Sequence, residues 1–290
     1  MNSTRGSTAT VCPITGGVSR MYARKGDGVY FRDPDSNIIF LAERPRLEDM
    51  AAFVDAEYEE GVYRDYVEAR ELKLATMRRR LPPIRQHARG SRLLDVGCGA
   101  GFLLEVALEE GFEPQGIELS PIAIELAQPT VRSRITCGDV NTLLANGTSE
   151  FDVVTAFDII EHTFDPPSFL DDVARVLAPG GLLVINTPDT GSWLRPLMRG
   201  HWPMLQPDQH TFLFSRPAMR AMLMDRGYEP LRIEAGRKVL TLDYLFGQLH
   251  QTNPALARYL DQAKRVLPSR IRYRELGINI GEMFLCARRL

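Results

Sequence analysis

The sequence predicts an α/β fold built around a doubly wound, mostly parallel β-sheet. Between Ser91 and Pro188, short apolar runs of strand length alternate with amphipathic stretches of helix length. This alternation is typical of parallel strands joined by crossover helices. The connections also carry the caps and glycines that begin and end helices. Both observations place one large sheet domain at residues 91–290.

Each element of the alternating region has its own boundary signals. Gly111 closes the first crossover helix, which is expected from Phe102 to Glu110. Ser120 caps the next helix, with Pro121 at its first position, and Asp165 opens a longer amphipathic helix. The five expected strands are Arg92 to Val96, Glu113 to Glu118, Arg134 to Gly138, Phe151 to Phe157 and Gly181 to Asn186.

Beyond Pro188 the alternation breaks and then resumes. The elements expected there are a helix from Ser215 to Gly227, a strand from Tyr228 to Glu234, helical sequence from Leu240 to Val266 and a last strand from Gly281 to Arg288. The last strand is expected to have an antiparallel partner. Two segments, near residues 189–214 and 240–275, are therefore insertions in the sheet domain.

Residues 1–90 precede the sheet and divide into two parts. Residues 1–46 form a small, glycine-containing segment. Residues 47–90 are expected to be a helical cap or lid, with helix-forming sequence from Leu47 to Leu81.

The composition excludes several classes of protein. Lys and Arg number 35 and Asp and Glu number 37, a formal net charge of −2, which argues against a surface made for nucleic acid or anionic membrane. No apolar run approaches the roughly 18 residues that span a bilayer. The polar start lacks the apolar core of a signal peptide, and the scattered cysteines form no disulfide framework. These are Cys12, Cys98, Cys137 and Cys286. We therefore expect a cytoplasmic protein.

The most informative motif joins the first strand to the first helix. A buried strand runs into Gly97, Gly99 and Gly101, and residues without a Cβ let a ligand lie against the backbone. The helix that follows offers free N–H groups to a carboxylate. The spacing G-x-G-x-G differs from the G-x-G-x-x-G that seats a pyrophosphate in dinucleotide folds. Glu118, 17 residues after Gly101, is placed to accept hydrogen bonds from both hydroxyls of a ribose.

From Leu93 to about Glu234 the chain resembles the class I S-adenosylmethionine-dependent methyltransferases. The matching motifs are Asp95-Val96-Gly97-Cys98-Gly99-Ala100-Gly101, Gly116-Ile117-Glu118-Leu119-Ser120, Gly138-Asp139-Val140, Phe151-Asp152-Val153-Val154 and Leu177-Ala178-Pro179-Gly180-Gly181. They occur in the order of the family and at fitting intervals. The resemblance implies a Rossmann-like sheet of seven strands with the last one antiparallel. It also implies S-adenosyl-L-methionine as cofactor and S-adenosyl-L-homocysteine as product.

The resemblance also implies which residues contact the cofactor. They are Asp95, Gly97, Cys98, Gly99, Gly101, Glu118, Leu119, Asp139, Val140 and Phe157. The glycine loop and Asp95 would hold the methionine part, Glu118 the ribose and Asp139 with Val140 the adenine edge. Phe157 would flank the cofactor. Taken singly, the glycine loop could be an ordinary strand-to-helix turn and Asp139 a solvated loop aspartate.

Two histidines are candidates for the catalytic base. Methyl transfer from a sulfonium is an in-line displacement, in which the protein aligns the acceptor and removes a proton from a hydroxyl or an amine. Ligands gather beyond the carboxyl ends of parallel strands, and His162 follows the fourth strand, which makes it the first candidate. His210 is the second, because the family often carries a histidine before the helix start at Phe214-Ser215. Either histidine could instead be a hydrogen-bonded structural residue.

Asp158, Glu161 and His162 resemble the Glu-x-x-Glu-His set of ubiquinone-pathway O-methyltransferases, where such residues can hold a divalent cation near a catechol. Oxygen ligands suit Mg²⁺, and a bound cation eases the deprotonation of a phenol. Aspartate at the first position shortens the reach of this set. The favoured interpretation is that Glu161 supports His162 and packs the loop, without a metal.

Asp165-Pro166-Pro167-Ser168 resembles the Asp-Pro-Pro-aromatic signature of methyltransferases that act on nucleic-acid bases. In those enzymes the motif ends the fourth strand and its aromatic residue stacks on the flipped base. Here it comes after His162 and ends in serine, so a proline-assisted helix start is preferred. Arg78-Arg79-Arg80 and Arg270 to Arg274 are interpreted as solvated surface, with contact to an anionic substrate as the alternative.

The N-terminal segment resembles the paired-cysteine zinc module that precedes some sugar and natural-product methyltransferases. The matching stretches are Cys12-Pro13-Ile14-Thr15 and Asp33-Pro34-Asp35-Ser36. A tetrahedral zinc site needs four good ligands, and Thr15, Asp33 and Ser36 stand at three of the four positions. No zinc is expected, and the segment is interpreted as a packing or substrate-covering element.

Aromatic residues in both added regions are candidates for an acceptor pocket. Tyr58, Tyr63 and Tyr66, with the segment Trp193 to Phe214, could form its lid or could be core residues. We expect methylation of a small molecule, with a hydroxyl as the favoured acceptor, in secondary or cofactor metabolism. Carbon or nitrogen methylation of a sugar or natural product is the alternative. The net charge and the displaced Asp-Pro-Pro disfavour a nucleic-acid methyltransferase, and the intact motifs disfavour a non-catalytic cofactor-binding protein. No nucleic-acid or membrane partner is expected, and the oligomeric state stays open.

Overall fold

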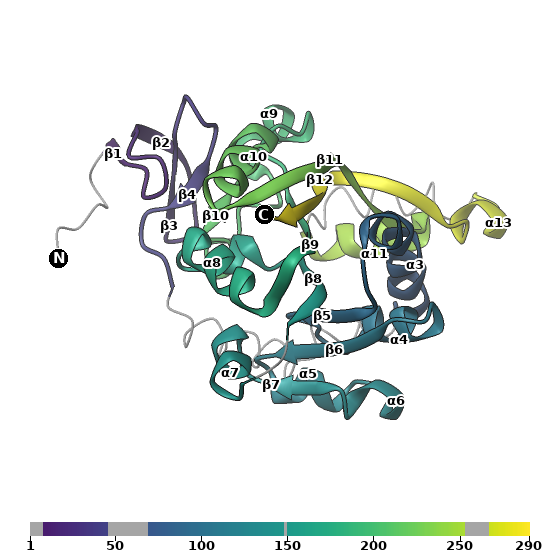
Figure 1. The fold of residues 1–290 in the computed structure, drawn as a ribbon. Helices are drawn as coiled ribbons and strands as arrows, with labels where there is room; N and C mark the ends of the chain where they lie inside the picture. The colour runs from purple at the N-terminus through teal and green to yellow at the C-terminus, as the bar shows by residue number, and fades with distance from the viewer. Residues whose placement is uncertain (1–7, 46–68, 148–149, 253–266) are drawn as a thin grey trace.

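A computed structural model describes residues 8–45, 69–147, 150–252 and 267–290 of the chain (Figure 1). In these residues the strands form two sheets, one of seven strands and one of five. Helices cover both faces of the larger sheet, and the smaller sheet lies to one side of it. One hydrophobic core runs between the two sheets, since Phe31 and Phe40 of the smaller sheet pack in the same cluster as Ile185 of the larger.

The seven-stranded sheet has the order β11-β12-β9-β8-β5-β6-β7. Its strands are β5 (Arg92–Val96), β6 (Glu113–Glu118), β7 (Ile135–Cys137), β8 (Phe151–Phe157), β9 (Leu177–Pro188), β11 (Tyr228–Leu240) and β12 (Leu276–Arg289). The strands from β9 across to β7 pair in parallel, whereas β12 is antiparallel to both β9 and β11. The predicted doubly wound sheet with an antiparallel last strand is confirmed.

The last two strands are longer than the sequence predicts. β11 ends at Leu240 and not at Glu234, and β12 begins at Leu276 and not at Gly281. The two strands pair along the added length, with Leu240 opposite Leu276. Ladder hydrogen bonds therefore hold residues that carry no apolar alternation, which is why the pattern missed them.

β9 also begins earlier than predicted. Its first residue, Leu177, lies four positions before the predicted start at Gly181 and pairs with Phe151 of β8. The helix ends at Val176, and Gly180 and Gly181 lie inside the strand. Gly180 and Gly181 are thus accommodated inside a central strand, next to an irregularity in its pairing with β8.

The helices and 3₁₀ turns are α3 (Arg70–His87), α4 (Phe102–Glu109), α5 (Pro121–Glu125), α6 (Pro129–Arg132), α7 (Val140–Ala145), η2 (Ile160–His162), α8 (Pro166–Val176), α9 (Leu194–Met198), η3 (Arg199–His201), α10 (Arg216–Asp225), α11 (Leu242–Thr252) and α13 (Ser269–Arg272). α3 and α4 bury one side each against one face of the large sheet, with Ile84 and Leu103 in their cluster. α8 and α10 pack on the other face through Leu170 and Met219. No helix in the described ranges has the length and apolarity needed to cross a membrane.

The predicted helix starts are confirmed at three caps. The side chains of Ser120, Asp165 and Ser215 each accept a hydrogen bond from the backbone N–H three residues later, with proline in the first turn. Asp165 accepts from Ser168 N at 3.3 Å. The Asp-Pro-Pro-Ser stretch is therefore a helix start, as the sequence predicts.

α3 passes the point where the sequence predicts its end. Pro82 and Pro83 lie inside the helix, which continues to His87, although prolines usually end a helix. Leu81 and Ile84 are buried against the sheet, and this packing outweighs the lost backbone bonds. The part of the predicted helix before residue 69 lies outside the described residues, as does the part of the Leu240 to Val266 helix after Thr252.

The five-stranded sheet joins the N-terminal segment to the insertion. Its strands are β1 (Ala9–Val11), β2 (Val18–Lys25), β3 (Gly28–Arg32), β4 (Ile39–Leu41) and β10 (Phe212–Leu213), in that order. β10 pairs with β4, with Phe212 opposite Phe40 and Leu213 opposite Ile39. A two-residue strand has no periodicity to read, so the sequence does not predict this connection.

The turns that resemble a zinc module meet around one carboxylate. Asp33 Oδ2 accepts hydrogen bonds from the hydroxyls of Thr15 and Ser36, each at 2.7 Å, and Asp33 Oδ1 accepts one from Asp35 N at 3.1 Å. Burial alone would raise the pKa of Asp33, but these hydrogen bonds lower it below its ordinary value. Cys12 is buried and is not in a disulfide. Hydrogen bonds therefore join the segments that cysteine and zinc join in the module this region resembles.

Candidate functional site

The glycine loop between β5 and α4 has a left-handed backbone at each glycine of the motif. The φ angles are +68° at Gly97, +53° at Gly99 and +74° at Gly101, which side chains with a Cβ rarely adopt. A Cβ at Gly97 would also lie 2.0 Å from Ile159 Cδ1. The loop therefore keeps its backbone open at the carboxyl end of β5, where α/β proteins bind ligands.

Two carboxylates lie at this loop. Glu118 accepts hydrogen bonds from Gly99 N at 2.8 Å and Ser120 N at 3.0 Å, so its position is fixed by the loop that it serves. A carboxylate has about four acceptor sites, and two main-chain bonds leave room for the hydroxyls of a ribose. Asp95 accepts a hydrogen bond from Thr155 Oγ1 at 2.6 Å, and burial raises its pKa to about 7.

The predicted adenine side is formed by the start of α7. Asp139 Oδ1 accepts hydrogen bonds from Thr142 N at 3.0 Å and from Thr142 Oγ1 at 3.1 Å. The bonds recorded among the described residues all reach Oδ1, so Oδ2 is available to an amino group. Val140 is buried beside it, and Leu119 is more than one third exposed. These three residues lie where the sequence predicts them, at the ends of β6 and β7.

Cys98 and Phe157, the two remaining residues predicted to contact the cofactor, have buried or packed side chains. The Cys98 side chain is buried under the loop, against Gly116, so only its backbone faces the site. Phe157 packs on Phe284, with ring centroids 6.2 Å apart.

Arg80 is a residue of this site that the sequence interpretation missed. Its guanidinium carbon lies 4.7 Å from the centre of the Phe157 ring, and the residue is 4% exposed. Arg80 Nη2 lies 3.5 Å from Glu282 Oε2. Among the described residues, neither Nε nor Nη2 of Arg80 makes a hydrogen bond. These two donors can therefore bind a further anion beside the Glu282 carboxylate. The apolar stretch around it on α3 is the signal that could have separated Arg80 from its solvated neighbours.

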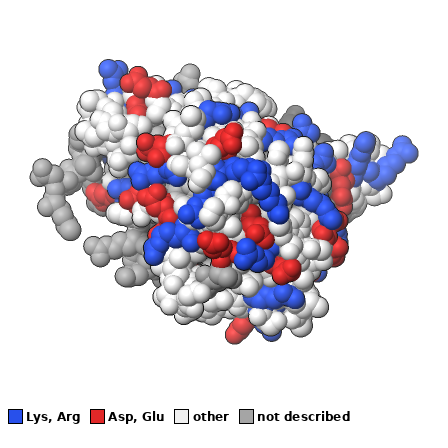
Figure 2. Space-filling model, viewed as in Figure 1, with Lys and Arg blue, Asp and Glu red and all other residues white. Residues whose placement is uncertain are grey.

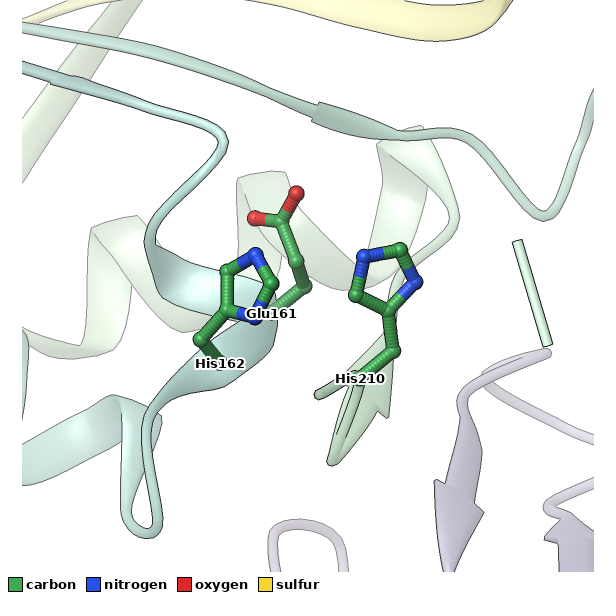
Figure 3. Close-up of side chains that lie close together, drawn as sticks. All are labelled: Glu161, His162 and His210. Atoms are coloured by element: carbon green, nitrogen blue, oxygen red, sulfur yellow. The ribbon is translucent and has the colours of Figure 1, made fainter. Parts of the chain in front are cut away.

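The predicted catalytic histidines meet at the end of β8 (Figure 3). The ring centroids of His162 and His210 lie 4.9 Å apart, and potential ligand atoms of Glu161, His162 and His210 lie within 4.8 Å of one another. His162 comes from η2 and His210 from the loop before β10. Residues separated by 48 positions in the chain, which the sequence offers as first and second candidates for the base, thus lie side by side.

Main-chain carbonyl groups set the tautomer of both rings. His162 Nδ1 lies 3.1 Å from Gln209 O, and His210 Nδ1 lies 2.7 Å from Met204 O. A ring nitrogen that contacts a carbonyl oxygen carries the proton, so Nε2 of each ring has the free lone pair. Figure 3 shows both rings and the Glu161 carboxyl group turned toward a common space.

Burial keeps the three groups of this cluster uncharged. It lowers the pKa of His210 to about 3, with His162 as a second cause, and it also lowers the pKa of His162. Burial together with the Asp158 charge raises the pKa of Glu161 well above its ordinary value. Near pH 7 the two rings are therefore neutral bases, beside a carboxyl group whose protonated form is favoured by burial.

Asp158 does not lie with Glu161 and His162 in one group of potential metal ligands, as it would in the Glu-x-x-Glu-His set that these residues resemble. Its carboxylate accepts a hydrogen bond from Asn186 Nδ2 at 2.9 Å and lies 3.3 Å from Lys238 Nζ, which also contacts Glu282 Oε1 at 2.6 Å. Burial opposes ionisation of Asp158, but Lys238 and Arg80 lower its pKa far below the usual range. In the described part of the chain, His210 takes the place of Asp158 in the group that could hold a metal.

The aromatic residues proposed as a lid are placed in part. Tyr58, Tyr63 and Tyr66 lie outside the described residues. In the insertion, Trp193 is exposed, whereas Trp202 is fully buried against Tyr30 and Leu205. Trp202 is therefore a core residue of the N-terminal sheet.

Comparison with known proteins agrees with these features. A family model described as a methyltransferase domain matches residues 66–233. A ubiquinone biosynthesis O-methyltransferase of Psychrobacter arcticus is 34% identical over 185 residues, which cover 59% of this chain and 68% of that protein. One of Caulobacter sp. is 37% identical over 103 residues, 34% of this chain and 41% of that protein.

The similarity to the curated relatives covers only part of their length, and the similarity to solved structures concerns the fold. The chain spans between 41% and 49% of the length of the first three curated relatives. An S-adenosylmethionine-dependent methyltransferase structure from Archaeoglobus fulgidus superposes with a TM-score of 0.51 at 19% identity, covering 76% of this chain and 94% of that one. The fold, the glycine loop and the matched family model lead to one conclusion. The chain belongs to the methyltransferase domain family, whose model matches residues 66–233, and its sheet has the fold of S-adenosylmethionine-dependent methyltransferases.

Proposed function

We propose that this enzyme transfers a methyl group from S-adenosylmethionine to a hydroxyl group of a small molecule in secondary or cofactor metabolism. The observation that carries the proposal is the pair of histidines whose Nδ1 atoms face main-chain carbonyl oxygens, so that each ring presents an unprotonated Nε2. A hydroxyl acceptor needs such a base, because its proton must leave as the new bond forms. The names of the ubiquinone O-methyltransferase relatives support oxygen as the acceptor atom.

The residues around the glycine loop fit the cofactor. When bound, S-adenosylmethionine supplies a methyl group on a positively charged sulfur. The loop from Gly97 to Gly101 and Asp95 hold the methionine part, and the open donors of Arg80 bind its carboxylate. Glu118 holds the ribose hydroxyls. Asp139 accepts from the adenine amino group.

Leu119, Val140, Cys98 and Phe157 complete this binding site. Leu119 follows Glu118, the carboxylate that holds the ribose. Val140 packs beside the adenine, and Cys98 contributes its backbone. Phe157 flanks the cofactor, and its ring packs against the Arg80 guanidinium. The donors and acceptors on this edge thus match the amino and carboxylate groups of the methionine part and the two hydroxyls of the ribose.

His162 is the proposed general base. Its Nε2 takes the proton of the acceptor hydroxyl while the oxygen attacks the methyl carbon in line with the breaking bond to sulfur. The positive charge that forms on the ring is stabilised by ionised Asp158, whose charge raises the His162 pKa against the effect of burial. His210, whose ring meets His162 edge to face, keeps the base in position and excludes water, and it is the second candidate for the base.

Carbon or nitrogen methylation of a sugar or natural product is the alternative. It would use the same cofactor edge and differ in the acceptor. A nucleic-acid acceptor has less support, because the Asp165 motif caps a helix and acidic and basic side chains are interspersed on the face drawn in Figure 2. We also propose a cytoplasmic location and no zinc in the N-terminal segment.

Magnesium at Asp158, Glu161 and His162 is not part of the proposal. The ion pair of Asp158 with Lys238 and its hydrogen bond from Asn186 favour a charge-stabilising role for this carboxylate. If a cation were required, activity would be lost on chelation and restored by magnesium.

We propose three segments of the chain with different roles. Residues 1–46 are a covering segment, residues 47–90 a helical cap, and residues 91–290 the cofactor domain with its insertions near 189–214 and 240–275. The N-terminal sheet that includes β10 supports close packing of the first segment on the third.

Transfer of labelled methyl groups tests the function. The full chain is incubated with methyl-tritiated S-adenosylmethionine and with catechol, phenol, a nucleotide-linked deoxysugar and single-stranded DNA. Label on the oxygen of a phenolic compound is expected. Label on carbon or nitrogen of the sugar would replace the proposal by its alternative, and label in DNA would refute both. Absence of S-adenosylmethionine binding in calorimetry would remove the common premise.

A further inference from the structure

The turn from Met204 to His210 controls both histidine rings. Met204 O accepts from His210 Nδ1 at 2.7 Å, and Gln209 O contacts His162 Nδ1 at 3.1 Å. Within the turn, His210 N donates to Gln206 O at 2.7 Å. A displacement of this turn would therefore move one ring directly and remove the hydrogen-bond acceptor of the other.

Tyr30, on β3 of the N-terminal sheet, reaches this turn from below. Its hydroxyl donates a hydrogen bond to His210 O at 3.2 Å, although the two residues are 180 positions apart. Tyr30 is fully buried, in a cluster with Trp202 and Leu205 of the insertion. Burial and the nearby Asp208 charge raise the pKa of Tyr30, so the phenol remains a donor over the whole physiological range.

The same sheet holds the chain on both sides of the cluster. Leu41 N donates to Thr211 O at 2.9 Å, directly after His210, and β4 pairs with β10. On the other side, Arg44 Nη1 donates to Phe164 O at 2.7 Å, two residues after His162.

Thr211 links these two sides. Thr211 N and Oγ1 donate to Glu161 O at 2.8 Å and 2.9 Å. The N-terminal sheet, the His210 loop and the residues around His162 are thus joined by main-chain contacts at each step.

We propose that the N-terminal sheet is a positioning element of the active site, and that Tyr30 is the residue through which it holds His210 against His162. The inference rests on the proposed function, in which these histidines act on the acceptor. Tyr30 touches neither acceptor nor cofactor and is a positioning residue. Its effect is expected in turnover, because small displacements of a catalytic group lower the rate steeply, by up to about a hundredfold for ~1 Å.

Tyr228 provides a matched control. It is also fully buried, and its hydroxyl also donates to a main-chain carbonyl, Leu170 O, at 2.8 Å. That carbonyl belongs to α8, away from the histidines. Tyr30→Phe and Tyr228→Phe therefore remove the same group from the same kind of environment and differ in what the group holds.

The experiment compares both variants as full chains. Similar losses of melting temperature and unchanged affinity for S-adenosylhomocysteine are expected. Tyr30→Phe should lower kcat about tenfold or more with the acceptor that the label experiment identifies, and move the acid limb of the pH profile toward the ordinary histidine pKa. Tyr228→Phe should keep the wild-type kcat and pH profile.

Histidine ring signals give a readout that needs no acceptor. In ¹⁵N-histidine-labelled protein with S-adenosylhomocysteine bound, Tyr30→Phe should shift the ring nitrogens of His162 and His210, and Tyr228→Phe should leave them unchanged. Equal kcat in the two variants, or unshifted signals in Tyr30→Phe, would overturn the proposal. Because this spectrum is independent of turnover, it separates failure of the positioning role from failure of the proposed function.

Arg44→Gln is the second variant, in case Tyr30→Phe does not fold. It removes the hydrogen bond to Phe164 O and the contacts of the guanidinium with the rings of Phe164 and Phe212, all made by a half-exposed side chain. A smaller fall in kcat and a shift confined to the His162 ring are expected. Wild-type signals and kcat in this variant would contradict a positioning role of the N-terminal sheet.

Discussion

Glu118 and Asp139 accept their hydrogen bonds from residues in or next to the cofactor motifs, whereas Glu161, His162 and His210 are held by groups from separate segments of the chain. Gly99 N and Ser120 N fix Glu118 within one strand and its neighbouring loop. In contrast, His162 depends on Gln209 O, and Glu161 accepts a hydrogen bond from Thr187 Oγ1.

This difference separates a preformed binding edge from an assembled acceptor site. Apart from Arg80 of α3, the cofactor edge needs only the strands and loops that carry its motifs, and main-chain N–H groups hold Glu118 there. The histidine cluster needs the central sheet, the insertion and the N-terminal sheet at once. We therefore expect changes at the first region to alter cofactor affinity and changes at the second to alter turnover.

The largest effect is expected from His162→Ala. Loss of a general base lowers kcat by about 10²- to 10⁴-fold, while S-adenosylmethionine affinity stays at the wild-type value. Steady-state kinetics and calorimetry measure the two quantities. His87→Ala, at the last turn of α3, is the control and should change neither. Wild-type kcat in His162→Ala would transfer the role of base to His210.

Glu118→Ala should change the cofactor edge and not the histidine cluster. Two hydrogen bonds to a charged acceptor contribute about 1.5 to 3 kcal/mol each, so the dissociation constant for S-adenosylmethionine should rise at least a hundredfold (~3 kcal/mol). Glu113→Ala, at the exposed start of the same strand, should leave it unchanged. Equal affinity of the two variants in calorimetry would refute the ribose assignment.

Asp95→Asn should separate stability from binding. The folded-state pKa of Asp95 is about 7, above the ~3.9 of an unfolded chain. The folded state therefore binds more protons between these values, and this group makes the protein less stable as pH rises through that window. The variant should melt higher than wild type at pH 8 and equally at pH 4, where both side chains are neutral.

The same substitution should weaken S-adenosylmethionine binding about tenfold, since one charge-assisted hydrogen bond is lost. Asp152→Asn is the opposite case, because the hydrogen bond from Arg92 lowers the Asp152 pKa and ionisation stabilises the fold. It should melt lower than wild type at pH 8. Thermal unfolding at both pH values checks the direction of each change in melting temperature. A lower melting temperature of Asp95→Asn than of wild type at pH 8 would contradict the prediction for Asp95.

The smallest effect is expected from metal removal. Dialysis against EDTA should leave kcat and the melting temperature unchanged, because a hydrogen-bonded carboxylate joins the N-terminal turns and two neutral histidines serve the acceptor. Metal analysis should find less than one zinc per chain. Loss of activity that magnesium restores would favour a metal at the histidine cluster.

The sequence predicts most of the sheet domain because its signals are local. Caps such as Ser120 and Asp165 and the glycines of the first loop lie within a few residues of the element they define. The cofactor residues follow from the same short motifs. Pairing and packing decide the features that were missed, such as the extension of β11 to Leu240 and the passage of α3 through Pro82.

The acceptor site shows the limit of a local pattern more clearly. The sequence singles out His162 and His210 as residue types, but not their contact. That contact depends on carbonyl groups of Met204 and Gln209, which have no side-chain signature. Arg80 likewise stands third in a row of three arginines, and the structure distinguishes it from the other two by its burial.

The two residues of β10 also affect the order in which the chain can fold. β4 ends at Leu41 and its partner ends at Leu213, so the ribosome must add 172 further residues before the N-terminal sheet acquires its fifth strand. At about 5 to 20 residues per second, this takes roughly 10 to 30 s. During that time β4 is a sheet edge with unpaired backbone groups, which can recruit strands from other chains. Slow translation should therefore increase aggregation during synthesis, even where the mature protein is stable.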